Sequence, residues 1–186
     1  MLADDSSDNE GATRVVKALE QAGAVIHRLT CPAEQDLHAG RYAAIVLTGD
    51  AESSERAAGD RRLAQLVREF LASDKPIAAL GDAVRIIARA GGAAGRMLST
   101  PADASLKASL EGAGATLVDE PVHVDQSLVT AGDSARASDF AERVAREFAD
   151  LLEDHELDEM SDLSFPASDP PASSPPSISR DPDARA

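Results

Sequence analysis

The chain has 186 residues, of which 43% are apolar, and it carries 18 Lys and Arg against 33 Asp and Glu, for a formal net charge of −15. This length suits one domain with a tail, and the apolar fraction is sufficient for a buried core. The acidic balance repels phosphate backbones and anionic membrane surfaces, so we expect neither a nucleic acid nor a membrane as partner. The sequence shows no run of 18 apolar residues and no signal peptide after Met1, so we expect a soluble cytoplasmic protein.

Helical and strand patterns alternate along the first 152 residues. Helices are expected where apolar residues recur every three or four positions after a capping residue, and strands where short aliphatic runs occur. In chain order the patterns predict a helix at 11–22, strands at 24–29 and 43–47, a helix between Asp60 and Asp74, a strand at 76–80, helices at 83–90 and 103–111, strand pieces at 116–118, 122–124 and 128–130, and a helix at 135–152.

This alternation predicts an α/β fold with a mostly parallel sheet and helices on both faces. The first strand of such a fold is normally central and buried, yet only Met1, Leu2 and Ala3 precede the polar residues 4–8. Either the strand is short or the chain begins inside it, through a misplaced start or as a domain of a longer polypeptide.

Residues 153–186 differ in composition from the rest of the chain. They are acidic and rich in Pro and Ser, with pairs such as Pro170-Pro171 and no apolar periodicity. We therefore expect one domain at 1–152 and a disordered acidic tail at 153–186.

Ligands of open parallel sheets bind beyond the carboxyl ends of the strands. In this chain those ends are predicted at 4–9, 48–50 and 81–83. The segment from Lys75 to Ile87, KPIAALGDAVRII, has the form of a nucleophile elbow, in which a strand, a tight turn and a helix N-terminus follow one another. The predicted ligand pocket comprises six residues: Asp8, Gly49, Asp50, Gly81, Asp82 and Ala83.

Four motifs together resemble the DJ-1/PfpI family, within the class I glutamine amidotransferase-like superfamily. They are YAAIVLTGD at 42–50, KPIAA at 75–79, GRMLSTP at 95–101 and GATLVDEPVHVDQSLVT at 114–130. The resemblance covers about Asp4 to Leu152. It implies a flavodoxin-like three-layer sandwich, and commonly a homodimer.

Active members of that family carry a Cys-His pair at the elbow, with Cys as the nucleophile and an acidic residue nearby. The resemblance places Gly81 and Asp82 at the Cys and His positions, and the acidic position near Asp8. Glycine has no side chain for attack, and an Asp at a helix N-terminus is a poor base because the helix dipole lowers its pKa. The oxyanion-hole Gly-Gly of the family corresponds to Gly49-Asp50.

The elbow sequence AALGD at 78–82 looks most like the C-terminal domain of large-subunit catalases, which also lacks the cysteine, whereas 96–129 resembles free-standing PfpI proteins. The resemblance implies a non-catalytic domain that is structural, oligomerising or regulatory, as a homodimer or attached to a larger enzyme such as a catalase. Two alternatives remain: a divergent PfpI-type hydrolase or glyoxalase-like enzyme that uses Asp8 and Asp82 as acid and base, and a small-molecule binding module.

Other candidate motifs favour structural roles. The single cysteine, Cys31, has no disulfide partner and is expected to be an inert small residue. The four histidines lack metal-ligand spacing, and near the acidic residues Asp4, Asp5 and Asp8 a calcium loop fails because Glu10 stands where its glycine must be. The glycines at 91–95 lack the lysine of a phosphate loop. We expect no metal and no cofactor.

Overall fold

The computed structural model describes residues 10–29 and 37–162. Its main sheet has the strand order β1-β2-β6-β5, in which the first three strands are parallel and β5 is antiparallel to β6. A second sheet pairs β3 with β4 in parallel. The strands are β1 (Ile45–Leu47), β2 (Ile77–Leu80), β3 (Met97–Ser99), β4 (Thr116–Val118), β5 (Val122–Asp125) and β6 (Leu128–Ala131).

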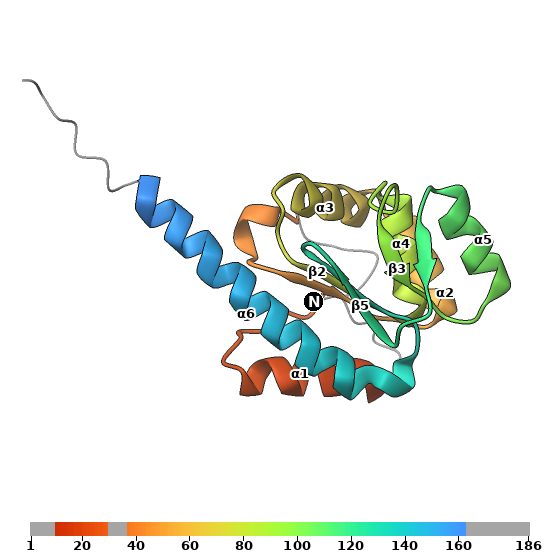
Figure 1. Ribbon diagram of the computed structural model, residues 1–186, viewed down its shortest axis with the longest axis horizontal. Helices are drawn as coiled ribbons and strands as arrows, with labels where there is room; N and C mark the ends of the chain where they lie inside the picture. The colour runs from red at the N-terminus through yellow and green to blue at the C-terminus, as the bar shows by residue number, and fades with distance from the viewer. Residues whose placement is uncertain (1–9, 30–36, 163–186) are drawn as a thin grey trace, which may run out of the picture.

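Helices cover both faces of the main sheet, as the sequence predicts (Figure 1). One face is covered by α1 (Glu10–Gln21) and α6 (Ala137–Asp162), and the other by α2 (Ala51–Ala58), α3 (Arg61–Ala72) and α4 (Val84–Arg89), with α5 (Ala104–Gly112) beside β4. Three single-turn helices lie at Ala39–Arg41, Gly81–Ala83 and Ser134–Arg136. The architecture is therefore a three-layer α/β sandwich.

The strand β2 separates two hydrophobic clusters. Side chains of a strand alternate between its faces, so Ile77 and Ala79 pack against the layer of α3 and α4, whereas Ala78 and Leu80 pack against α1 and α6. All four residues of β2 are at most 3% exposed. Such two-sided burial explains why this strand is a continuous apolar run in the sequence.

The helix α3 confirms the prediction made from its capping residue and apolar stripe. The Asp60 carboxylate accepts hydrogen bonds from the backbone N–H groups of Arg62 and Leu63. Of the predicted stripe, Leu63, Leu66, Val67 and Phe70 are buried and Leu71 is partly buried. A cap and a 3.6-residue period are local properties, so the sequence alone specifies this helix.

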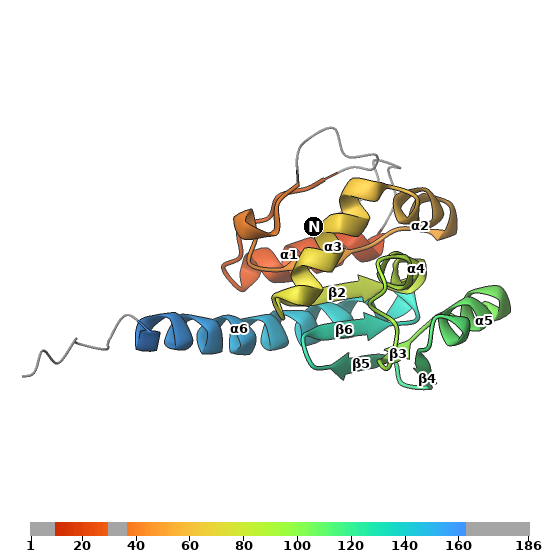
Figure 2. The same cartoon turned by 90° about the horizontal axis from the view of Figure 1, so that it is seen from above.

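Several predicted elements differ from those observed. The predicted strand at 24–29 is wrong, because 24–28 form no ladder and Leu29 has only an isolated bridge. The helix α2 and the strand β3 lie where no element was predicted. The helix α6 reaches Asp162, past its predicted end at Leu152, so 153–162 are helical rather than irregular. The C-terminal part of this helix extends away from the sheet (Figure 2).

Within the described ranges, no helix is both long and apolar enough to cross a membrane.

Candidate functional site

The turn after β2 has the shape of a nucleophile elbow. The strand ends at Leu80, Gly81 has a φ of +64°, and a single helical turn leads into α4. A side chain would be strained at this φ, which glycine adopts freely. A Cβ built on Gly81 would meet no heavy atom within 4 Å. The elbow therefore keeps room at the position of the nucleophile but carries no reactive group there.

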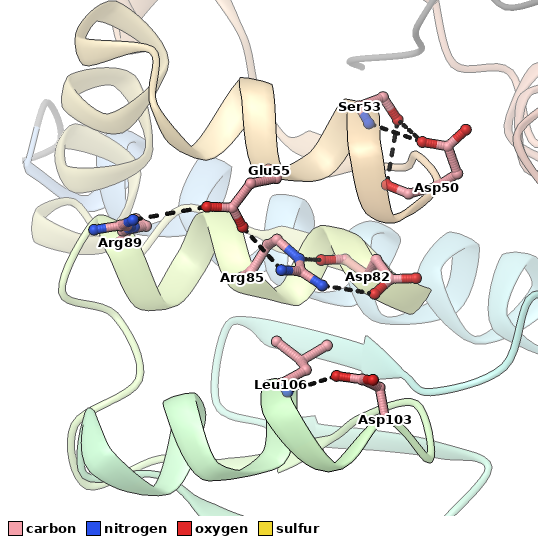
Figure 3. A network of polar contacts seen from close by, with 8 residues as sticks. All are labelled: Asp50, Ser53, Glu55, Asp82, Arg85, Arg89, Asp103 and Leu106. Carbon is pink, nitrogen blue, oxygen red and sulfur yellow. Dashed lines mark hydrogen bonds and ion pairs between the residues drawn. The ribbon is translucent and has the colours of Figure 1, made fainter.

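Asp82 follows in the single helical turn, and its carboxylate pairs with Arg85 of α4. The Oδ1 atom of Asp82 lies 2.9 Å from Nη2 of Arg85, and Nε of Arg85 donates to the Asp82 carbonyl oxygen at 3.3 Å (Figure 3). The Asp82 side chain is 26% exposed. The carboxylate of Asp82 is therefore already engaged in an ion pair with a guanidinium.

Arg85 also connects the elbow to α2. Its Nη1 atom donates to Oε2 of Glu55 at 2.9 Å, and the other oxygen of Glu55 lies 3.7 Å from Nη2 of Arg89. Burial lowers the pKa of Arg85, but the hydrogen bonds from its guanidinium to Asp82 and Glu55 outweigh burial and raise this pKa above its ordinary value. We call Glu55, Asp82, Arg85 and Arg89 the elbow network. It fixes the start of α4 against α2.

Gly49 and Asp50 begin α2 at the same edge of the sheet, since β1 and β2 are parallel neighbours. The Oδ1 atom of Asp50 accepts hydrogen bonds from the backbone N–H and the hydroxyl of Ser53, both at 2.8 Å. The first of these bonds is the main cause that lowers the pKa of Asp50. A Cβ at Gly49 would lie 2.7 Å from Oγ of Ser53. Gly49 therefore permits close packing, and Asp50 acts as a helix cap.

The structure brings together part of the predicted pocket. Gly49 and Asp50 lie at the edge that also carries Gly81 and Asp82, whereas Ala83 is 0% exposed and belongs to the core. Asp8 lies outside the described residues, as does Cys31. The paired-carboxylate hypothesis for Asp8 and Asp82 therefore remains a prediction.

Sequence reasoning missed the partners of Asp82. The spacing of Asp82 and Arg85 by three positions on a helix is a recognisable signal for an ion pair. Glu55 gives no such signal, because its approach depends on how α2 packs on α4.

A second polar cluster lies where β3 meets β5 and β6. Nδ1 of His123 lies 2.8 Å from a Glu120 carboxylate oxygen, and Ser99 donates to the Glu120 carbonyl oxygen at 2.6 Å. Nε2 of His123 and the hydroxyl of Thr100 are buried and have no hydrogen-bond partner among the described residues. A cavity of about 470 Å³ is lined by Ser99, Thr100 and Glu120 among others.

Over the described residues, no group of three or more His, Cys, Asp or Glu is placed to hold a metal ion.

An open, mostly parallel sheet with helices on both faces and an elbow at its carboxyl edge defines a flavodoxin-like α/β protein. The sequence matches the model of the DJ-1/PfpI family over residues 25–147. The chain therefore belongs to the DJ-1/PfpI family.

Solved structures share this fold. A ThiJ/PfpI domain protein from Brachyspira murdochii has a TM-score of 0.69 and 21% identity, over 77% of this chain and 90% of that one. Drosophila melanogaster DJ-1beta has a TM-score of 0.67 and 20% identity, over 88% and 96%. A two-domain Anabaena variabilis protein with dj-1/thij/pfpi-like and ferritin-like domains has a TM-score of 0.71 and 15% identity, over 80% and 48%. No curated protein matches the chain.

Proposed function

We propose that this chain is a non-catalytic DJ-1/PfpI domain with a structural, oligomerising or regulatory role in the cytoplasm. The observation that carries the proposal is the elbow itself. Gly81 supplies no nucleophile, and the carboxylate of Asp82 is paired with Arg85 at 2.9 Å. Covalent catalysis needs an activated nucleophile beside a free base, and the described part of the elbow supplies neither.

The elbow network is an argument for a structural role of this region. Arg85 is held by two carboxylates, that of Asp82 in the turn before α4 and that of Glu55 on α2. A guanidinium with two fixed partners keeps the turn in one geometry. Arg85 thus joins the elbow to α2, and Asp82 helps to hold the guanidinium that makes this contact.

We propose that the domain acts through self-association as a homodimer or through attachment to a larger enzyme such as a catalase. The Anabaena variabilis protein supports the second arrangement, because a domain of this fold occurs there in one chain with a ferritin-like domain. A small-molecule binding role is the second candidate. It is favoured by the 470 Å³ cavity and by the Thr100 hydroxyl beside it, which has no hydrogen-bond partner among the described residues.

The direct test is an activity assay on the purified full chain with glyoxals, a simple amide and a peptide as substrates. We expect no turnover above the buffer rate, and the same result for Asp82→Ala. Asp103→Ala is the matched control, since Asp103 is likewise an aspartate at the start of a helix but lies outside the elbow network. Turnover that Asp82→Ala abolishes and Asp103→Ala preserves would refute the proposal and favour a divergent enzyme.

A further inference from the structure

The cavity of about 470 Å³ lies at the carboxyl ends of three strands. Its lining comes from the last residues of β3 and β4 and from the turns after β3, β4 and β6, at 99–102, 118–121, 132, 133 and 136. The lining includes neither Gly81 nor a member of the elbow network. Small-molecule sites commonly lie beyond the carboxyl ends of parallel strands and have volumes of about 300–1,000 Å³. The cavity is therefore a candidate ligand site separate from the elbow.

The turns around the cavity are bound to one another by hydrogen bonds and close packing. The Ser99 hydroxyl donates to the carbonyl oxygen of Glu120 at 2.6 Å and accepts from the N–H of Gly132 at 3.1 Å. A Cβ on Gly132 would overlap the carbonyl oxygen of Thr100, so glycine is needed for this close approach. The cavity is therefore pre-formed, which lowers the entropic cost of binding a ligand.

The lining carries more negative than positive charge. Asp119, Glu120 and Asp133 contribute carboxylates, whereas Arg136 is the only cation of the lining. Arg136 also lies 3.4 Å from Asp139, so its charge is already shared with another carboxylate. Such a lining attracts a cation and repels an anion. Because no group of His, Cys, Asp or Glu in the described part of the chain is placed to hold a metal ion, these carboxylates favour an organic cation.

The hydrogen-bonding capacity of the carboxylates narrows the class of cation. One oxygen of Glu120 lies 2.8 Å from Nδ1 of His123, and Oδ1 of Asp133 accepts from the N–H of Ala135 at 2.8 Å. These contacts engage one oxygen of each carboxylate, and the side chain of Glu120 is 58% exposed. Asp119 is exposed as well. An ammonium group has three donors, so it can bind several carboxylate oxygens at once.

Thr100 provides a second observation that is independent of charge. Its hydroxyl is buried and has no hydrogen-bond partner among the described residues, although Thr100 lines the cavity. A buried hydroxyl without a partner destabilises the free protein. Rotation about χ1 exchanges the positions of the hydroxyl and the methyl group of a threonine. A ligand in the cavity can therefore supply the partner that this hydroxyl lacks.

We propose that this cavity binds a small organic cation, in which a primary ammonium group is joined to a short aliphatic stem. The ammonium group donates to the carboxylates of Asp119 and Glu120. The stem packs on Val118 and on the rings of Pro101 and Pro121, which provide apolar surface in the lining. This inference rests on the second candidate function, small-molecule binding, and it names the ligand class. It does not involve the elbow.

The test is isothermal titration calorimetry of the full chain with putrescine, a diamine with a four-carbon stem, in buffer of low ionic strength. We expect saturable binding at one site. The diol with the same stem has no charge, and succinate has the same number of carbons with two negative charges, so we expect no measurable binding of either compound. These two compounds separate the effect of charge from that of size.

Asp119→Asn removes a carboxylate of the lining, and we expect it to weaken the binding of putrescine by about tenfold, the usual effect of losing a charged hydrogen bond. Asp150→Asn is the matched control. It makes the same change of charge at an exposed position of α6 outside the cavity, so we expect a change of less than about twofold.

Thr100→Val removes the hydroxyl and keeps the shape of the side chain. We expect it to weaken binding by about fivefold, as the loss of a neutral hydrogen bond does. The melting temperature of the free protein should not fall, because the hydroxyl has no hydrogen bond to lose among the described residues. A lower melting temperature for Thr100→Val would show that the hydroxyl is satisfied in the free protein, and would contradict its role in binding.

Three results would overturn the proposal. The first is no saturable binding of putrescine to the folded, unmodified chain. The second is equal weakening in Asp119→Asn and Asp150→Asn, because binding would then reflect a general attraction to the net charge of −15. The third is binding of the diol as tightly as the diamine. None of these results bears on the elbow, whose lack of catalysis is tested separately by the activity assay.

Discussion

At Gly81 the backbone has the shape of a nucleophile elbow, but the residue has no reactive side chain. Its φ of +64° belongs to the left-handed region, while the space around its Cβ position is open. A side chain at this position is therefore opposed by backbone strain and not by steric overlap. The elbow retains a conformation that only glycine adopts without strain.

We expect Gly81→Cys to fold and to lose about 1–2 kcal/mol in the free energy of unfolding, the usual cost of a left-handed L-residue. Urea denaturation measures the change. Gly112→Cys is the matched control, because Gly112 also has open space at its Cβ position but has no positive φ. Equal free energies of unfolding for the two variants would show that φ at Gly81 costs little.

Arg85 is the residue on which the elbow network depends. Its side chain is 22% exposed and binds two carboxylates at 2.9 Å. We expect Arg85→Ala to lower the free energy of unfolding by about 1 kcal/mol, a value below that of a fully buried charged hydrogen bond because solvent screens the pair.

Arg89→Ala is the control for this prediction, measured in the same chemical denaturation series. Arg89 contacts the same Glu55 at 3.7 Å with a side chain that is 67% exposed. Exposed pairs at such distances contribute little, so a change within about 0.5 kcal/mol is expected. A larger loss in Arg89→Ala than in Arg85→Ala would contradict the assignment of Arg85 as the centre of the network.

At the scale of elements, α2 depends on its cap. Asp50 accepts two hydrogen bonds from Ser53, which hold its pKa below the ordinary value of 3.8. Because the folded pKa is the lower one, the cap contributes its full stability above pH 3.8 and loses it as the pH falls through the folded pKa.

We therefore expect Asp50→Ala to cost about 1 kcal/mol at neutral pH, and this difference to shrink as the pH falls through and below the ordinary pKa. Denaturant titrations at a series of pH values measure it. Asp50→Asn keeps a capping side chain but has no group that titrates. We therefore expect this variant to be as stable as the unmodified protein at neutral pH, and to lose less stability than the unmodified protein when the pH falls. A cost for Asp50→Ala that does not change with pH would contradict the prediction.

Local patterns explain which elements and site residues could be predicted. The cap and stripe of α3 lie within one segment, and the elbow around Gly81 follows from strand, turn and helix signals in sequence. The segment AESSERAA of α2 has only alanines as apolar residues, so its burial depends on contact with α4. The predicted strand at 24–29 failed for the opposite reason: its local pattern is adequate, but a ladder needs a neighbouring strand. The contact of Glu55 with Arg85 likewise exists only after packing.

For the whole molecule, the net charge of −15 is the dominant long-range effect. Like charges repel in the compact state, and this repulsion is screened as the Debye length falls from about 30 Å at 0.01 M salt to about 8 Å at 0.15 M. We expect the melting temperature to rise over this range of sodium chloride. Differential scanning calorimetry at both concentrations measures it. A fall in the melting temperature would show that screened ion pairs, such as the elbow network, outweigh the general repulsion.

The two-sided burial of β2 has a consequence for how the molecule unfolds. Ile77 and Ala79 complete the core on one face, and Ala78 and Leu80 complete the core on the other. Neither layer of helices can separate from the sheet without exposing residues of this strand, whose remaining contacts hold the opposite layer. The two hydrophobic cores are therefore coupled through β2. We expect both layers of helices to unfold together in a single cooperative transition, and not one layer before the other.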